Sequence, residues 1–168
     1  MTKLLDDLKT FFKDDGWGFT EIEDFPALRL PFRARNGEWA CYAQARSDQD
    51  LFVFYSIFPI KTPETHRLKM SEFITRANYG LLIGNLEMDF SDGEIRYKTS
   101  VAMDEIQLTP ALINPVVYAN VLTTEHYLPG ILSVLNDDKS PEEAVLMIEK
   151  QELLQESKPN IEGNEEDT

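Results

Sequence analysis

The chain has 168 residues, of which 42% are hydrophobic, enough to bury one ordinary core without disulfides or metals. Its formal net charge of −14 disfavours nucleic acid and anionic membranes as partners, because both are bound mainly by cationic side chains. The single cysteine, Cys41, excludes an internal disulfide and every metal site built from several cysteines.

Residues 3–15 have the pattern of an amphipathic helix that ends at Gly16. Its apolar residues recur at helical spacing: Leu4, Leu5, Leu8, Phe11 and Phe12. The carboxylates Asp6 and Asp7 stand where a secretion signal needs an apolar stretch, and no run approaches the ~20 apolar residues of a membrane span. We therefore expect a cytoplasmic protein.

The dipeptide Asn36-Gly37 is a strong hairpin signal, because both residues tolerate the positive φ of a type I′ turn. A two-residue loop at this point pairs Phe32 with Cys41 on an apolar face. On the other face it pairs Arg29 with Gln44. This register predicts that Cys41 is a buried, inert thiol rather than an exposed nucleophile.

A second hairpin is predicted around Asp92-Gly93. With these two residues as the loop, Met88 lies opposite Tyr97 on an apolar face. Glu87 then lies opposite Lys98 on a charged face. The charges of this hairpin are explained as cross-strand pairs, without a functional site.

Residues 51–58 indicate a strand with almost no polar alternation. We expect Phe52, Phe54 and Phe58 to point to the helix-covered side of the sheet. The residues expected on the other side form our candidate surface for a partner protein or a second copy of the chain: Tyr42, Leu51, Val53, Tyr55 and Ile57. In the alternative, the second helix or the chain ends cover this side within the monomer.

Three further helices are predicted. One spans residues 63 to about 78. Another begins at residue 110, and Pro129 should kink or divide this second helix. The segment Ser140-Pro141-Glu142-Glu143 is a capping box for a last helix, 141–156. The acidic segment 157–168 is expected to be a disordered tail.

These elements predict an α+β fold in the order α-β-β-β-α-β-β-α-α. The strands should form an antiparallel twisted sheet with helices on one face, and residues 1–156 should form a single domain. We identify no catalytic, metal-binding or cofactor-binding residue, since His66 and His126 lie in no ligand pattern and no phosphate-binding glycine loop is present. We therefore expect that the chain is not an enzyme.

The stretch from Ala77 to Asp89, running into Asp92–Lys98, resembles the YbjN-domain family of bacterial proteins. Asn120 and Tyr127-Leu128-Pro129 fit the same family, and the resemblance covers roughly residues 3–136. It implies a fold similar to the type III secretion chaperones, often dimeric. Members are described as regulators of sensory transduction, and the resemblance brings no catalytic residues.

The sequence thus favours a non-catalytic protein-binding module, chaperone-like or regulatory, that acts as a monomer or a homodimer. Its acidic surface would favour basic partners. The alternative is a small-molecule sensor or enzyme with a pocket between sheet and helices. A passive structural subunit of a larger assembly also remains open.

Overall fold

The computed structural model describes residues 3–103 and 108–156. The predicted tail, 157–168, lies outside the described residues. The elements follow one another as α1 (Lys3–Asp14), β1 (Thr20–Glu21), β2 (Ala27–Ala34), β3 (Gly37–Arg46), β4 (Leu51–Lys61), the 3₁₀ turn η1 (Glu64–His66), α2 (Arg67–Gly80), β5 (Asn85–Met88), β6 (Glu94–Ala102), α3 (Pro110–Asn136) and α4 (Pro141–Glu156).

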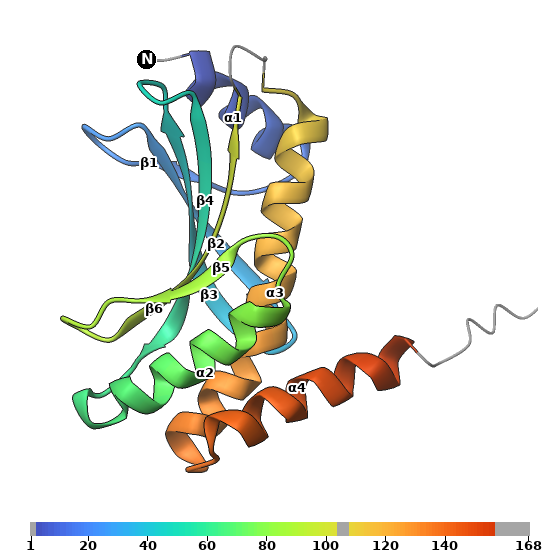
Figure 1. The fold of residues 1–168 in the computed structure, drawn as a ribbon. Coiled ribbons are helices and arrows are strands. Elements are labelled where there is room, and N and C mark those ends of the chain that lie inside the picture. The colour runs from blue at the N-terminus through green and yellow to red at the C-terminus, as the bar shows by residue number, and fades with distance from the viewer. Residues whose placement is uncertain (1–2, 104–107, 157–168) are drawn as a thin grey trace, which may run out of the picture.

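The strands form one antiparallel sheet in the order β1-β2-β3-β4-β6-β5. α3 runs along one face of the sheet with α1 beside its upper end, while α2 and α4 pack together near the β5–β6 hairpin (Figure 1). The α+β class and the element order are confirmed. The two-residue strand β1 is an addition at the edge of the sheet.

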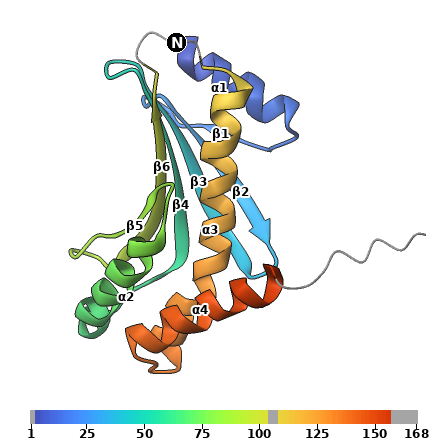
Figure 2. The ribbon, with the colours of Figure 1, turned by 45° about the vertical axis from the view of Figure 1, so that its right-hand side comes forward.

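One contiguous core lies between the sheet and the helices. The apolar face of α1 is buried as its spacing predicts, with Leu8 and Phe12 fully enclosed. Phe52, Phe54 and Phe58 of β4 point into the same core. Figure 2 shows α3 running along the sheet in front of its strands.

A buried polar contact fixes α3 against the sheet. The side-chain amide of Asn120 donates to the carbonyl oxygen of Phe54 at 3.0 Å and to that of Tyr97 at 3.1 Å. The hydroxyl of Thr99 donates to the carbonyl oxygen of Val116 at 2.8 Å. Because buried hydrogen bonds depend on direction, these contacts set the position of the helix along β4 and β6.

The predicted register of the β2–β3 hairpin is wrong by two residues. Phe32 lies opposite Trp39, and Arg29 lies opposite Tyr42. The loop residues are Arg35 and Asn36, and neither Asn36 nor Gly37 has a positive φ. A shift of two keeps every side chain on its predicted face, so Cys41 is still buried.

The observed register is accompanied by contacts with α3 that the local sequence does not reveal. The Glu125 carboxylate accepts a hydrogen bond from the backbone N–H of Arg35 at 2.9 Å, and the Asn36 side chain donates to the Glu125 carbonyl oxygen at 3.0 Å. A Cβ atom on Gly37 would lie 2.9 Å from the Leu128 side chain. The glycine at this position therefore eases close packing against Leu128 and is not used for a positive φ.

The β5–β6 register is also shifted by two residues from the prediction. Met88 lies opposite Ile95, and Glu87 lies opposite Arg96. The backbone N–H of Gly93 donates to the carbonyl oxygen of Asp89 at 2.8 Å, which closes a longer loop with Gly93 at φ 77°. The predicted apolar and charged faces are retained.

Two helix predictions have different outcomes. α3 continues through Pro129 to Asn136, so the helix is not divided there. The capping box is confirmed, since the Ser140 hydroxyl accepts from the N–H of Glu143 at 3.2 Å while the Glu143 carboxylate accepts from the N–H of Ser140 at 3.0 Å. Among the described residues, no helix is both long and apolar enough to cross a lipid bilayer.

Candidate functional site

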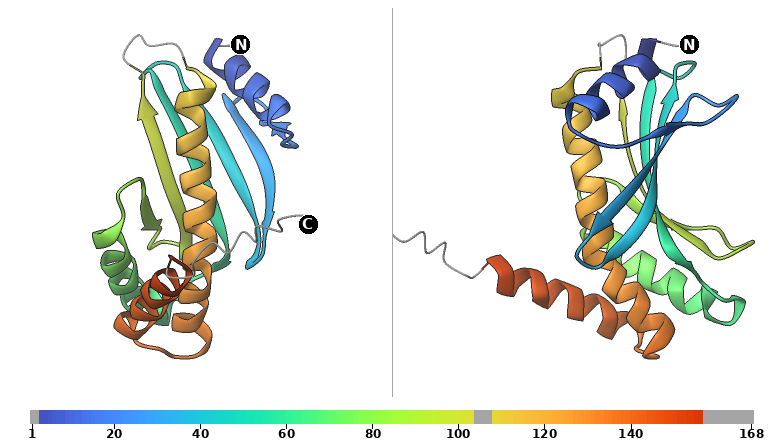
Figure 3. Two further views of the ribbon diagram at one scale, coloured as in Figure 1. Left: turned by 90° about the vertical axis from the view of Figure 1, so that its right-hand side faces the viewer. Right: turned by 180° about the vertical axis from the view of Figure 1, so that it is seen from behind.

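The five residues of the candidate surface share the side of the sheet opposite α1 and α3, which we call the open face. None of the described helices lies on this side (Figure 3). In the alternative prediction the second helix covers this side of the sheet, but α2 packs instead against α3, α4 and β5. Val53 and Tyr55 are nevertheless buried, while Tyr42, Leu51 and Ile57 are half-buried.

The strand register arranges the open face in rows that cross the sheet. The central row consists of Arg29, Tyr42, Tyr55, Lys98 and Asn85. The row beside it consists of Pro31, Ala40, Ile57, Arg96 and Glu87. On the other side of the central row lie Ala27, Gln44, Val53 and Ser100, followed by Arg46, Leu51 and Ala102.

An aromatic pair with cations at both ends forms the middle of this surface. Tyr42 and Tyr55 are direct neighbours on β3 and β4, and Arg29 lies next to Tyr42 on β2. The Arg96 guanidinium lies over the Tyr55 ring, 4.8 Å from its centre. This cation–π contact shields the ring and helps to explain its burial.

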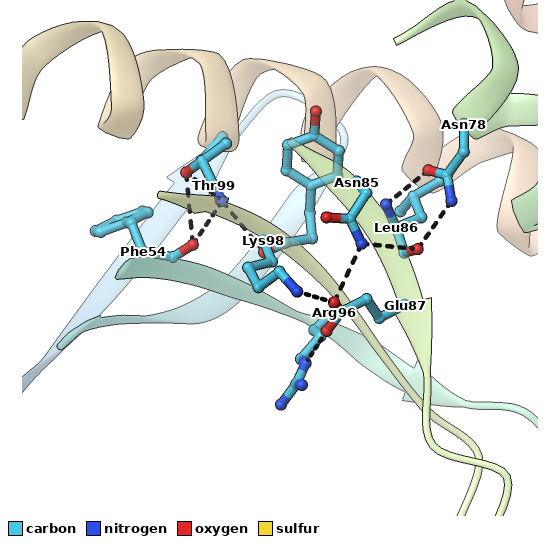
Figure 4. A network of polar contacts seen from close by, with 10 residues as sticks. Phe54, Asn78, Asn85, Leu86, Glu87, Arg96, Lys98 and Thr99 are labelled. Atoms are coloured by element: carbon cyan, nitrogen blue, oxygen red, sulfur yellow. Dashed lines mark hydrogen bonds and ion pairs between the residues drawn. The ribbon is translucent and has the colours of Figure 1, made fainter. Parts of the chain in front are cut away.

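Glu87 connects the two cations on β6 (Figure 4). It accepts a hydrogen bond from Arg96 at 2.8 Å and forms an ion pair with Lys98. Burial by itself would raise the pKa of Glu87, but hydrogen bonds from Lys98, Asn85 and Arg96 outweigh it and hold that pKa below its usual value. Glu87 is therefore charged at neutral pH and orients both cations.

β5 is held in place by a paired contact from α2. The Asn78 side chain donates to the carbonyl oxygen of Leu86 at 3.0 Å and accepts from its N–H at 2.8 Å, as a neighbouring strand would (Figure 4). This contact satisfies both main-chain groups of Leu86 on that side. Asn78 thus supports the strand that carries Glu87.

A shallow hollow of about 660 Å³ lies on the open face. Its lining includes Arg29, Tyr42, Tyr55, Ile57 and Arg96. The predicted alternative placed a ligand pocket between the sheet and the helices, where the described side chains form the packed core. The open face therefore offers both shape and mixed chemistry for a ligand.

Cys41 is fully buried, as predicted. Burial raises the pKa of its thiol to about 12, while hydrogen bonds from Ser56 and Trp39 act in the opposite direction. Its sulfur contacts the Ser56 hydroxyl at 3.3 Å. Such a thiol stays protonated at neutral pH and is unsuited to nucleophilic attack. Within residues 3–103 and 108–156, no three His, Cys, Asp or Glu side chains gather in a way that could hold a metal ion.

The cations of the open face do not follow from the register that the sequence predicts. That register pairs Arg29 with Gln44 and explains Lys98 only as the cross-strand partner of Glu87. The correct register would have revealed them, because it places Arg29 beside Tyr42 and Lys98 beside Tyr55.

The fold and the site define an α+β protein whose antiparallel sheet is backed by helices on one side and open on the other. This chain belongs to the YbjN family: the family model, described as "Putative bacterial sensory transduction regulator", matches residues 4–131. A solved structure with this fold is that of YbjN from E. coli, described as "a putative transcription regulator". It is 15% identical, with a TM-score of 0.53 over 90% of this chain and 92% of that one. Among curated proteins, none matches this chain.

Proposed function

We propose that this chain is a non-catalytic regulator that binds a segment of a partner protein on its open face. The observation that carries the proposal is the position of Tyr42 and Tyr55, side by side in the middle of a sheet that helices back on the other side. Covering the exposed parts of the half-buried Tyr42, Leu51 and Ile57 would gain ~25 cal/mol per Å² of apolar surface, which favours association.

The family supports the regulatory part of the proposal, because its description is that of a regulator of sensory transduction. Regulators act through contacts with other macromolecules and need no reactive group. The protonated, enclosed Cys41 thiol agrees with a role that does not depend on catalysis.

The mode of binding that we propose is capture of an extended segment on the sheet, since the resemblance to the YbjN family implies a fold similar to that of the type III secretion chaperones. A homodimer is the other use of the same surface, because Tyr42 and Ile57 would pack equally well against a second copy. In both cases the half-buried apolar residues of β3 and β4 form the centre of the contact.

Site-specific photo-crosslinking tests the location. A photoreactive amino acid replaces Tyr42 on the open face or, as the matched control, Leu122, which is 59% exposed on α3. We expect adducts from position 42 only, and Ile57→Glu in the same protein should remove them. Equal adducts from both positions, or none from position 42, would contradict the proposal.

The mass of the adduct identifies the occupant. A mass twice that of the chain indicates a homodimer, which light scattering on wild type and Tyr42→Glu would check independently. A small-molecule sensor would instead respond in thermal-shift assays to a metabolite, with no adduct at position 42.

A further inference from the structure

The open face has the opposite charge to the rest of the chain. In the four rows described above, four cations accompany one carboxylate: Arg29, Arg46, Arg96 and Lys98 against Glu87. The next row adds the ion pair of Arg33 with Glu38, and Glu94 also lines the hollow, so the excess of cations lies in the central rows. The whole chain has 16 basic and 30 acidic residues. The negative charge that we expected to attract basic partners therefore lies outside the central rows of the open face.

Much of this positive charge is not neutralised within the described residues. Glu87 pairs with both Arg96 and Lys98, so it offsets only one of their two charges. Arg29 and Arg46 are exposed and form no ion pair with a described carboxylate. Arg46 only approaches the Gln44 side chain, at 3.4 Å. The open face thus presents the unpaired Arg29 at one end of the aromatic pair and the Arg96–Lys98–Glu87 cluster, with one excess positive charge, at the other.

The central row has a spacing that an extended peptide can match. Arg29 and Lys98 are separated by three strand intervals, which at ~4.8 Å each amount to roughly 14 Å. In an extended segment, side chains at positions i and i+4 point to the same side and are also separated by roughly 14 Å. The residue at i+2 would then lie above Tyr42 and Tyr55.

We propose that the open face binds an acidic extended protein segment with a carboxylate at i, a bulky apolar residue at i+2 and a carboxylate at i+4. Arg29 binds one carboxylate, Lys98 with Arg96 binds the other, and the half-buried Tyr42 packs against the apolar side chain, beside the Tyr55 ring that Arg96 covers. This inference rests on the proposed function and adds the chemistry of the partner.

Charge complementarity favours an acidic protein segment over nucleic acid as the occupant. The backbone of a nucleic acid carries a charge at every nucleotide and would be repelled by the remaining surface of a chain with net charge −14. A segment with two carboxylates needs only the local cations of the central row.

Fluorescence anisotropy with labelled peptides and the full chain tests the proposal. The probe contains the core Glu-Ser-Leu-Ser-Glu, and two controls contain Gln-Ser-Leu-Ser-Gln or the rearranged Glu-Glu-Ser-Leu-Ser. We expect the probe to bind at least tenfold more tightly than either control. Comparable binding of all three peptides, no binding of the probe, or preferential binding of an oligothymidine would overturn the inference.

Two variants with the same change of charge localise the contact. Arg29→Glu should weaken probe binding at least tenfold, whereas Lys13→Glu, exposed on α1, should change it less than twofold. Circular dichroism verifies that both variants are folded, and Arg29→Gln provides a milder change at the same site. Equal effects of Arg29→Glu and Lys13→Glu would refute the assignment.

The outcome can be separated from that of the proposed function. If the Gln peptide binds as well as the probe and Tyr42→Ser removes both, the open face binds protein but does not select acidic segments. The inference then fails while the proposed function stands. If position 42 gives no crosslink, the proposed function itself fails.

Discussion

The side-chain amide of Asn120 donates a hydrogen bond to the carbonyl oxygen of Phe54, 3.0 Å away in the middle of β4. The same amide nitrogen also donates to Tyr97 on the neighbouring strand. One residue of α3 therefore holds two central strands from the buried side. The open face on the other side of these strands depends on this alignment.

Replacing Asn120 should destabilise the fold. Asn120→Ala removes these hydrogen bonds and leaves the carbonyl oxygens of Phe54 and Tyr97 without this donor. We therefore expect a loss of about 1–3 kcal/mol in the free energy of unfolding. Urea denaturation measures the change. Asn114→Ala, exposed on the same helix, should leave stability nearly unchanged, and equal losses for both variants would contradict the role of Asn120.

A side chain at Gly93 should also destabilise the protein. A Cβ atom there would lie 2.0 Å from the carbonyl oxygen of Thr62, and the residue has φ 77°. The left-handed backbone conformation alone costs an alanine roughly 1–2 kcal/mol. We therefore expect Gly93→Ala to lower the free energy of unfolding by at least that amount. Gly18→Ala is the matched control, because its Cβ atom would meet nothing within 4 Å. Measured by thermal unfolding, the melting temperature should fall for Gly93→Ala and stay unchanged for Gly18→Ala.

The ion pairs of Glu87 predict a dependence of stability on pH. Because the folded state lowers the pKa of Glu87, its ionised form adds stability above the unfolded pKa of ~4.3, and this stability is lost as pH falls through the folded value. Glu87→Gln should cost roughly 0.5–1 kcal/mol at pH 7, since the pairs are partly exposed.

The wild type and Glu87→Gln should therefore converge in their free energy of unfolding as the pH is lowered below ~4. Denaturant titrations at a series of pH values measure the difference. A deficit that stays constant between pH 7 and pH 3 would show that the carboxylate charge does not contribute.

Cys41 should resist modification in the folded protein. With a pKa of about 12, roughly one thiol in 10,000 is ionised at pH 8, and the side chain is also enclosed. We expect iodoacetamide to label it only after unfolding in urea. A second cysteine introduced as Ser100→Cys on the open face should react in the native state, and rapid native labelling of Cys41 would contradict its burial.

The amino-acid sequence by itself determined the elements and their buried faces. The two-residue period of the strands assigns Phe52 and Phe54 to the core and Tyr55 to the other side, whatever the pairing partner. The capping box at Ser140 is likewise a local pattern of hydrogen bonds, and it forms as predicted. The candidate surface could be named from sequence for the same reason.

Only the tertiary structure decided which residues are neighbours across strands. Glu125 and Leu128 of α3 lie far along the chain from the β2–β3 turn, yet their contacts with Arg35 and Gly37 accompany a register two residues from the one that local turn preference gives. A shift of two preserves each side chain's face but changes its partner. The arrangement of Arg29 beside Tyr42 therefore follows from packing between distant segments, which no local pattern encodes.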